Sequence, residues 1–375
     1  MEFLPTTLGT RPRLAVELRA EGVVAACAED AAAPLAAIAR ALLPEGAIVT
    51  GLKAKNVADR ATVVMALRKT LEAVAEQASG RGRVVTLVVP DAAVRVLLLD
   101  FDSLPGKLAE ALPVVRFRLK KMLPFEAEDA AVSYQVMSSG KSGVRVVAVA
   151  MPREVLGEYE SVVREAGFEP GAVLPSTLAA LAGLDATDAP TLVVNAGPKG
   201  VTTAIVRGGM LLLHRSVDMT TEEPYVEPVV SVPPSLPLVD HESSIAEWSL
   251  QQPVAIGITA EVEAARVAAI AEPNAVLEDV REQLRELAST SGAHEVSQAV
   301  SVAAAYFEDT LGFAPSTILA AGTTGAIRLG HMLRDAGFGG EAIDVHEIVE
   351  PMMIATPSAE VPRGWLAGVR GALKS

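Results

Sequence analysis

Cysteine pairs, long hydrophobic runs and an export signal are all missing from this 375-residue chain, and aromatic side chains make up only 4% of it. Cys27 is the single cysteine, which excludes an intrachain disulfide and suits a reducing compartment. No apolar run approaches the roughly 18 residues of a membrane helix. The start, MEFLPTTLGT, has neither the basic nor the apolar region of a signal peptide. We therefore expect a cytoplasmic protein that inserts no helix of its own into a membrane.

Positive charge is scarce as well, because 46 acidic residues face 32 Lys and Arg residues and leave a net charge of -14. A diffuse negative field repels nucleic acids and anionic lipids, so we expect no nucleic-acid partner. The five histidines show no metal-binding spacing, and the sequence has no Walker A, G-x-S-x-G or dinucleotide motif. The sequence therefore predicts neither a metal site nor a catalytic residue.

Half of the residues are apolar, which is enough for a large core, and the length favours two or three lobes. Ala, Val and Leu must do most of the packing, as in α/β proteins with buried parallel strands. Hydrophobic periodicity predicts strands over 14–18, 84–89, 94–99, 132–136, 144–150, 191–195, 202–206, 210–217, 317–320 and 345–349. It predicts helices over 31–43, 57–77, 108–122, 153–166, 262–271, 275–288, 296–311 and 327–336.

The order of these elements predicts two unequal βα halves that are separated by an insertion and a linker. The linker, 219–244, holds five prolines and five acidic residues without Lys or Arg, a composition typical of an extended linker or loop. The expected division is a first lobe over 1–90 and 171–190, an inserted α+β subdomain over 91–170, and a second lobe over 191–218 and 245–375.

One stretch of the insertion has a distinctive order. A strand leads into the basic helical sequence RFRLKKMLPF, residues 116–125, and an acidic turn then leads to a strand that ends in Tyr134-Gln135-Val136. This pattern resembles the inserted subdomain of the PilM family of type IV pilus assembly. The resemblance implies an α/β, actin-like (ribonuclease H-like) bilobal ATPase fold with an inserted small α+β subdomain.

The resemblance also implies a role and partners. A PilM-like protein is a cytoplasmic scaffold that binds the N-terminal cytoplasmic tail of a PilN-like membrane protein. Through this tail it would connect indirectly to a PilO-like protein and to the pilus motor ATPases, peripheral to the inner membrane. Self-association and the use of the pilus for twitching motility, adhesion or DNA uptake stay open.

Three glycine turns would surround a nucleotide in the actin-like class, and the resemblance places them on 7–10, 195–200 and 320–325. An Asp beside the glycine of the first two turns orients Mg²⁺ and its water. Thr7 and Asn195 stand in these places, and Pro12 and Pro198 each remove a backbone donor. The nucleotide-site candidates are Gly9, Thr10, Asn195, Gly197, Lys199, Gly322 and Gly325. We expect a degenerate site with at most weak ATP binding and no efficient hydrolysis; purely structural glycines are the alternative.

The partner groove is expected between the inserted subdomain and the first lobe, where an extended peptide would gain main-chain hydrogen bonds. Its candidate residues are Val96, Leu98, Arg116, Phe117, Lys120, Pro124 and Phe125. The apolar stripe of the basic helix is expected at Leu108, Leu112, Val115, Leu119 and Met122. A solvated basic helix face, with both phenylalanines in the core, is the alternative.

Two other functions compete with the scaffold. An active ATPase or kinase of the same fold should keep acids at positions 7 and 195, where this chain has Thr7 and Asn195. The related cytoplasmic domain of type II secretion platforms continues into a membrane helix, which this sequence is not expected to contain.

Overall fold

The computed structural model describes residues 12–78, 82–141, 143–185, 187–219, 292–338, 343–355 and 361–374. The chain divides into two units, one formed by Met1–Met219 with Gly292–Ser375 and the other by Thr220–Ser291. All of the described residues belong to the first unit. The helices expected over 262–271 and 275–288, and the linker beyond Met219, lie outside the described residues.

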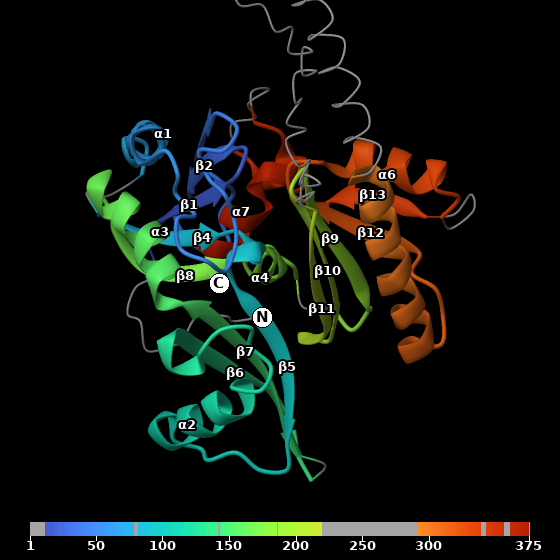
Figure 1. Cartoon of the computed structure of the whole chain (residues 1–375). Helices are drawn as coiled ribbons and strands as arrows, with labels where there is room; N and C mark the ends of the chain where they lie inside the picture. Colours follow the sequence, from blue (N-terminus) through green and yellow to red (C-terminus); the bar gives the residue numbers. More distant parts are fainter. Residues whose placement is uncertain are drawn as a thin grey trace, which may run out of the picture. The chain divides into compact units, whose positions relative to one another are not determined.

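The first sheet has the strand order β3-β2-β1-β4-β8 (Figure 1). Its strands are β1 (Leu14–Arg19), β2 (Gly22–Cys27), β3 (Ala37–Leu42), β4 (Val84–Val89) and β8 (Glu169–Pro175). The first three strands form an antiparallel meander, and β4 and β8 run parallel to β1. Helices α1 (Arg60–Ala75) and α3 (Arg153–Glu165) lie on one side of this sheet, and α4 (Ser176–Ala182) and α7 (Ala367–Lys374) lie on the other (Figure 1). The continuous apolar sequence of β4 is explained by this double cover.

The helix expected over 31–43 is wrong, because this segment contains strand β3. Pro34 lies within the segment and Pro44 directly follows it, so there is room for only a short helix, and short helices are marginal in water. Pairing with β2 along the whole of β3 satisfies the same backbone groups and overrides the helical preference of alanine and leucine. Strand β8 and helices α4 and α7 were not anticipated from the sequence.

The second sheet has the order β11-β10-β9-β12-β13. Its strands are β9 (Thr191–Gly197), β10 (Gly200–Arg207), β11 (Met210–Asp218), β12 (Thr317–Ala321) and β13 (Asp344–Glu347). A second apolar core joins this sheet to the helical residues 292–311 and to α6 (Ala326–Asp335). Gly208 and Gly209 lie between two of the strands expected from the sequence, 202–206 and 210–217, and form a two-residue hairpin turn in which φ is 55° and 75°.

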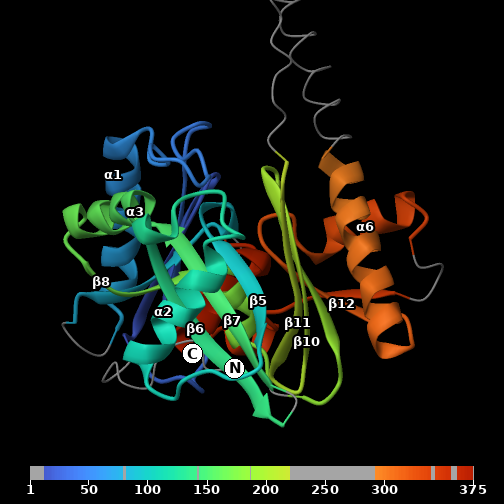
Figure 2. The same cartoon turned by 60° about the horizontal axis from the view of Figure 1, so that its bottom comes forward.

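The inserted segment forms a third sheet with the order β5-β7-β6 (Figure 2). Its strands are β5 (Arg95–Phe101), β6 (Ala130–Gly140) and β7 (Gly143–Pro152). Helix α2 (Leu108–Leu119) covers one face of this sheet and buries Ala111, Val115 and Leu119. Leu108 and Met122 are exposed, so these two members of the expected stripe are wrong. Ala111 of α2 is buried where Leu108 was expected, and α2 ends at Leu119, before Met122.

Helices α4 and α7 cross without room for side chains between them. A Cβ on Gly371 of α7 would collide with the backbone of Ala179 in α4. Gly183, at the end of α4, also lies directly against Gly371. Helix α7 follows the second sheet in the chain but packs against β1 and β4 of the first sheet. The last helix therefore ties together the two halves that the first and second sheets define. The lobe boundaries expected from the sequence are not tested by this arrangement and stay a prediction.

Candidate functional site

The turn that joins the first strand pair lies at Ala20 and Glu21, between β1 and β2. The glycine turn expected at 7–10 is a different segment, ahead of the first strand, and its role in a nucleotide site stays a prediction. Gly9 and Thr10, like Thr7, lie outside the described residues.

The other two turns lie where the sequence placed them. Strands β9 and β10 are joined at Pro198 and Lys199, directly after Asn195 and Gly197. Gly322 and Gly325 connect β12 to α6 with φ angles of 90° and 73°, which favour glycine. A Cβ on Gly322 would lie 2.6 Å from Oδ1 of Asn195, so this glycine leaves space for the Asn195 side chain.

A buried carboxylate stands beside the first turn. Glu17 in β1 is fully buried, and its Oε1 lies 2.6 Å from a guanidinium nitrogen of Arg19. Ser176 at the start of α4 donates its hydroxyl to the same oxygen at 2.6 Å. An acid that the sequence did not single out therefore stands close to this turn, and the chain's own cation, Arg19, holds it.

Asn195 of β9 reaches from the second half into the same cluster. Its amide Nδ2 lies 2.9 Å from Ser176 Oγ, 3.0 Å from Thr177 Oγ1 and 3.2 Å from Asp91 Oδ2. Arg19 approaches the Asn195 Oδ1 at 3.5 Å and donates to Ser176 Oγ at 3.1 Å. Asp91 is held in turn by the amide and the hydroxyl of Thr177, at 3.0 and 2.5 Å. We call these six residues, Glu17, Arg19, Asp91, Ser176, Thr177 and Asn195, the crevice network.

Burial sets the protonation of two groups at this point. Desolvation raises the pKa of Glu17 above its usual 4.5, although Arg19 and the Ser176 hydroxyl act in the opposite direction. Desolvation lowers the pKa of His214 on β11, and the nearby Asp91 opposes this shift. The region therefore favours neutral or internally paired groups over free charges.

The cavity beside the crevice network is small. About 80 Å³ remains between Arg19, Asn195, Lys199 and their neighbours. Sites that enclose a whole small molecule usually measure about 300–1,000 Å³. Lys199 is directed to an exposed partner, Glu45, at 3.3 Å. In this conformation the place expected for phosphates is filled by side chains of the protein.

The expected partner-groove residues do not share one surface. Val96 and Leu98 of β5 face an apolar core to which both halves contribute. Alternation along the strand places Leu97 and Leu99 on the opposite face, under α2. The other five candidates belong to the α2 layer, so the structure does not bring the seven residues together.

Within the α2 layer the candidates have different surroundings. Arg116 donates to the carbonyls of Ala127 and Ala130 at 2.9 and 3.1 Å, which makes it a structural link. Phe125 packs on the core of the inserted subdomain. Lys120 pairs with Glu128 at 3.0 Å, and Pro124 is exposed. Phe117 is 75% exposed and is the candidate most available to a partner.

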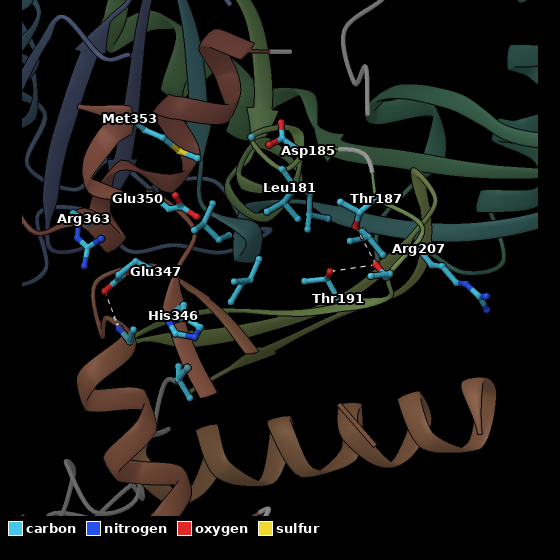
Figure 3. A pocket seen from close by; sticks show the side chains of 18 of the residues that line it. Leu181, Asp185, Thr187, Thr191, Arg207, His346, Glu347, Glu350, Met353 and Arg363 are labelled. Atoms are coloured by element: carbon cyan, nitrogen blue, oxygen red, sulfur yellow. Dashed lines mark hydrogen bonds between the residues drawn. The ribbon is translucent and has the colours of Figure 1, made fainter. Parts of the chain in front are cut away.

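A second cavity, of about 670 Å³, was not anticipated from the sequence (Figure 3). It lies between the end of α4, the β10–β11 hairpin and strand β13. Leu181 and Met353 contribute apolar surface, and Asp185 and Arg207 contribute charge. Glu347 accepts the backbone N–H of Ala326 at 2.8 Å and so caps α6 (Figure 3). The lining comes from segments far apart in sequence, which explains why no local pattern pointed to this cavity.

The residues that the structure describes offer neither a metal-binding cluster nor a membrane-spanning helix. These residues contain no group of three His, Cys, Asp or Glu side chains that could hold a metal ion. No helix among the same residues is long and apolar enough to span a bilayer.

Comparison with known proteins places the fold. No protein-family model and no curated protein sequence matches the chain. A chain of the solved PilM-PilN type IV pilus biogenesis complex matches with a TM-score of 0.64, over 96% of this chain and 98% of that one, at 17% identity. The chain has the actin-like fold of PilM. The fold class expected from the sequence is therefore confirmed.

Two further solved structures match with lower scores. The cytoplasmic domain of EpsL, an inner-membrane component of the type II secretion system of Vibrio cholerae, has a TM-score of 0.36 at 14% identity, over 55% of this chain and 71% of that one. A Bacteroides thetaiotaomicron protein with an actin-like ATPase fold has a TM-score of 0.43 at 9% identity, over 96% and 95% of the two chains.

Proposed function

We propose that this protein is a cytoplasmic scaffold of a type IV pilus assembly platform and binds the N-terminal tail of a PilN-like membrane protein. The observation that carries the proposal is the PilM fold over 96% of the chain, including the inserted β5-α2-β6-β7-α3 segment. The tail would connect the scaffold indirectly to a PilO-like protein and to the pilus motor. A nucleotide would bind weakly or not at all.

The inserted subdomain offers two features that suit a peptide. Strands β5 and β6 each pair only with β7 among the described strands, and an extended segment can add to such an edge. On α2, Phe117 is flanked by the exposed basic residues Arg118 and Lys121. An exposed aromatic side chain beside flexible cations is a suitable anchor for a partner segment.

The test is a calorimetric titration of the full chain with the tail peptide of a PilN-like protein. Phe117→Ala should weaken binding by about tenfold, because aromatic anchors carry a large share of interface energy. Met65→Ala is the matched control, since Met65 is a similarly exposed apolar residue on α1. Arg116 is unsuited to this test because its replacement would break the two carbonyl contacts inside the subdomain.

Two outcomes would count against the proposal. If wild-type protein takes up no peptide, the scaffold function fails. If Phe117→Ala and Met65→Ala bind as tightly as wild type, the tail binds elsewhere and the anchor on α2 is wrong.

An active ATPase is the second candidate, and the buried Glu17 favours it because an acid does stand beside the first turn. Phosphate release from ATP in the presence of Mg²⁺ separates the two functions. The scaffold proposal predicts no release above that of a Glu17→Gln variant. Turnover that depends on Glu17 would favour the enzyme.

A further inference from the structure

The crevice network matches most of its donors and acceptors within itself; the exceptions are Glu17 Oε2 and Arg19 Nε, which have no hydrogen-bond partner among the described residues. Ser176 donates to Glu17 and accepts from Arg19 and Asn195. Thr177 donates to Asp91 and accepts from Asn195. Asn195 contributes two amide hydrogens for these hydroxyls and one carbonyl oxygen for Arg19. The two carboxylates, Glu17 and Asp91, therefore accept hydrogen bonds from groups of the chain itself.

The network also spans the two halves of the molecule. Glu17, Arg19, Asp91, Ser176 and Thr177 all belong to the first half, whereas Asn195 lies on β9 of the second half. Arg19 and Asn195 are 9% and 6% exposed, so water scarcely competes for their hydrogen bonds. The exposed Lys199–Glu45 pair also joins the halves, but exposed pairs stabilise little.

We propose that Arg19 and Asn195 form a built-in latch that fills the phosphate end of the crevice and holds the two halves together without nucleotide. This inference rests on the proposed function only in assuming that the site no longer serves ATP. Arg19 supplies the positive charge that a bound cation would bring, and Asn195 supplies the donors that close the bridge.

The amide of Asn195 is the decisive group. An aspartate at this position would have no hydrogens for Ser176 and Thr177 and would place a third carboxylate beside Glu17 and Asp91. Asn195→Asp would, however, return the acid that an actin-like nucleotide site is expected to carry. The substitution therefore separates two hypotheses. If Asn195 belongs to a latch, Asn195→Asp should loosen the contact between the halves; if the site is only a weakened nucleotide site, Asn195→Asp should improve nucleotide binding.

The experiment is hydrogen–deuterium exchange and thermal unfolding of the full chain, with and without saturating Mg²⁺ and ATP. Asn195→Asp should speed exchange in β9 and α4 by about tenfold, the effect of losing one or two buried hydrogen bonds. Thr202→Val is the matched control. It removes the side-chain hydrogen bond to Ser216, which is 3.0 Å long and lies within the second half, so exchange in α4 should stay unchanged.

A double variant keeps the test open if Asn195→Asp fails to fold. Glu17→Gln combined with Arg19→Met removes both partners of the buried ion pair together, so neither is left without its counter-ion, and Asp91 keeps its hydrogen bonds from Thr177. It should fold, with faster exchange in β9 and α4 than in wild type. Wild-type Tm should not respond to Mg²⁺ and ATP.

The latch is overturned if exchange in β9 and α4 is unchanged in both variants, or if Mg²⁺ and ATP raise the Tm of wild type or of Asn195→Asp. These results are independent of the partner peptide. If the variants show that the latch is absent but the wild-type chain binds the peptide, the scaffold function stands and the latch alone fails. If the exchange results support the latch but no peptide binds, the scaffold function alone fails.

Discussion

Glu17 shows how one buried side chain constrains the chemistry of the crevice. It lies in a strand whose six residues are all buried, and its second oxygen, Oε2, has no hydrogen-bond partner among the described residues. A Cβ on Gly368 at the start of α7 would collide with this carboxylate. The carboxylate is therefore enclosed between Arg19, Ser176 and the start of α7, and a ligand could reach it only after the network opened.

The raised pKa of Glu17 predicts the direction in which the stability of the protein changes with pH. Because the folded-state pKa lies above the unfolded value of about 4.5, ionisation opposes folding, and the stabilising contribution is lost as the pH rises through the folded-state value. The free energy of unfolding of Glu17→Gln relative to wild type should therefore rise between pH 4.5 and neutral pH. Urea unfolding at a series of pH values measures this difference, with Glu72→Gln on the exposed side of α1 as control.

The loss of the Arg19 partner in Glu17→Gln shifts stability by an amount that is nearly constant over this pH range. The prediction therefore concerns how the difference in free energy of unfolding between Glu17→Gln and wild type changes with pH, and not the size of that difference at any one pH. A slope equal to that of the Glu72→Gln control would show that Glu17 is ionised without penalty.

At the scale of elements, the α4–α7 crossing depends on small residues. Adding a methyl group at Gly371 meets the backbone of Ala179, which cannot move without separating the helices. Gly371→Ala should destabilise the protein by about 1–3 kcal/mol, as overpacking of a tight contact does. Chemical denaturation measures the change.

A second helical glycine makes a matched control for this prediction. Gly157 lies inside α3, is exposed, and has nothing within 4 Å of the place where a Cβ would stand. Gly157→Ala should stabilise the protein by about 0.5–1 kcal/mol, because alanine loses less backbone entropy in a helix. Equal effects at the two glycines would contradict the close crossing.

Elements with strong local signals could be predicted from the sequence. The apolar run of β4 and the Gly208-Gly209 hairpin both agree with the structure because their determinants are local. Strand β3 was missed because its conformation depends on pairing with β2. Strand β8 carries Pro170, Gly171 and Pro175, which weaken a strand pattern.

The site was less predictable than the fold. Gly9 resembles the glycine of a phosphate turn, whereas the turn that joins β1 and β2, at Ala20 and Glu21, has no glycine between its strands. One local signal was available: Glu17 and Arg19 are two residues apart in a strand, so they share a face and can pair. The contribution of Ser176 could not be foreseen, since it stands 159 residues from Glu17 and meets it only in the folded chain.

At the scale of the whole molecule, the crevice network and the proposed partner surface lie on different parts of the fold. The crevice between the first and second sheets is filled by the crevice network, whereas the inserted subdomain has two strands that pair only with β7 among the described strands and carries an exposed aromatic residue. Partner binding should therefore take place at the inserted subdomain and leave the crevice little changed.

Hydrogen–deuterium exchange of the full chain, measured with and without the tail peptide of a PilN-like protein, tests this claim most directly. The account predicts slower exchange in the presence of peptide within the inserted segment 91–170, above all in α2 and in the edge strands β5 and β6. Protection confined to β9, β12 and the turn at Gly322, with no change over 91–170, would contradict it.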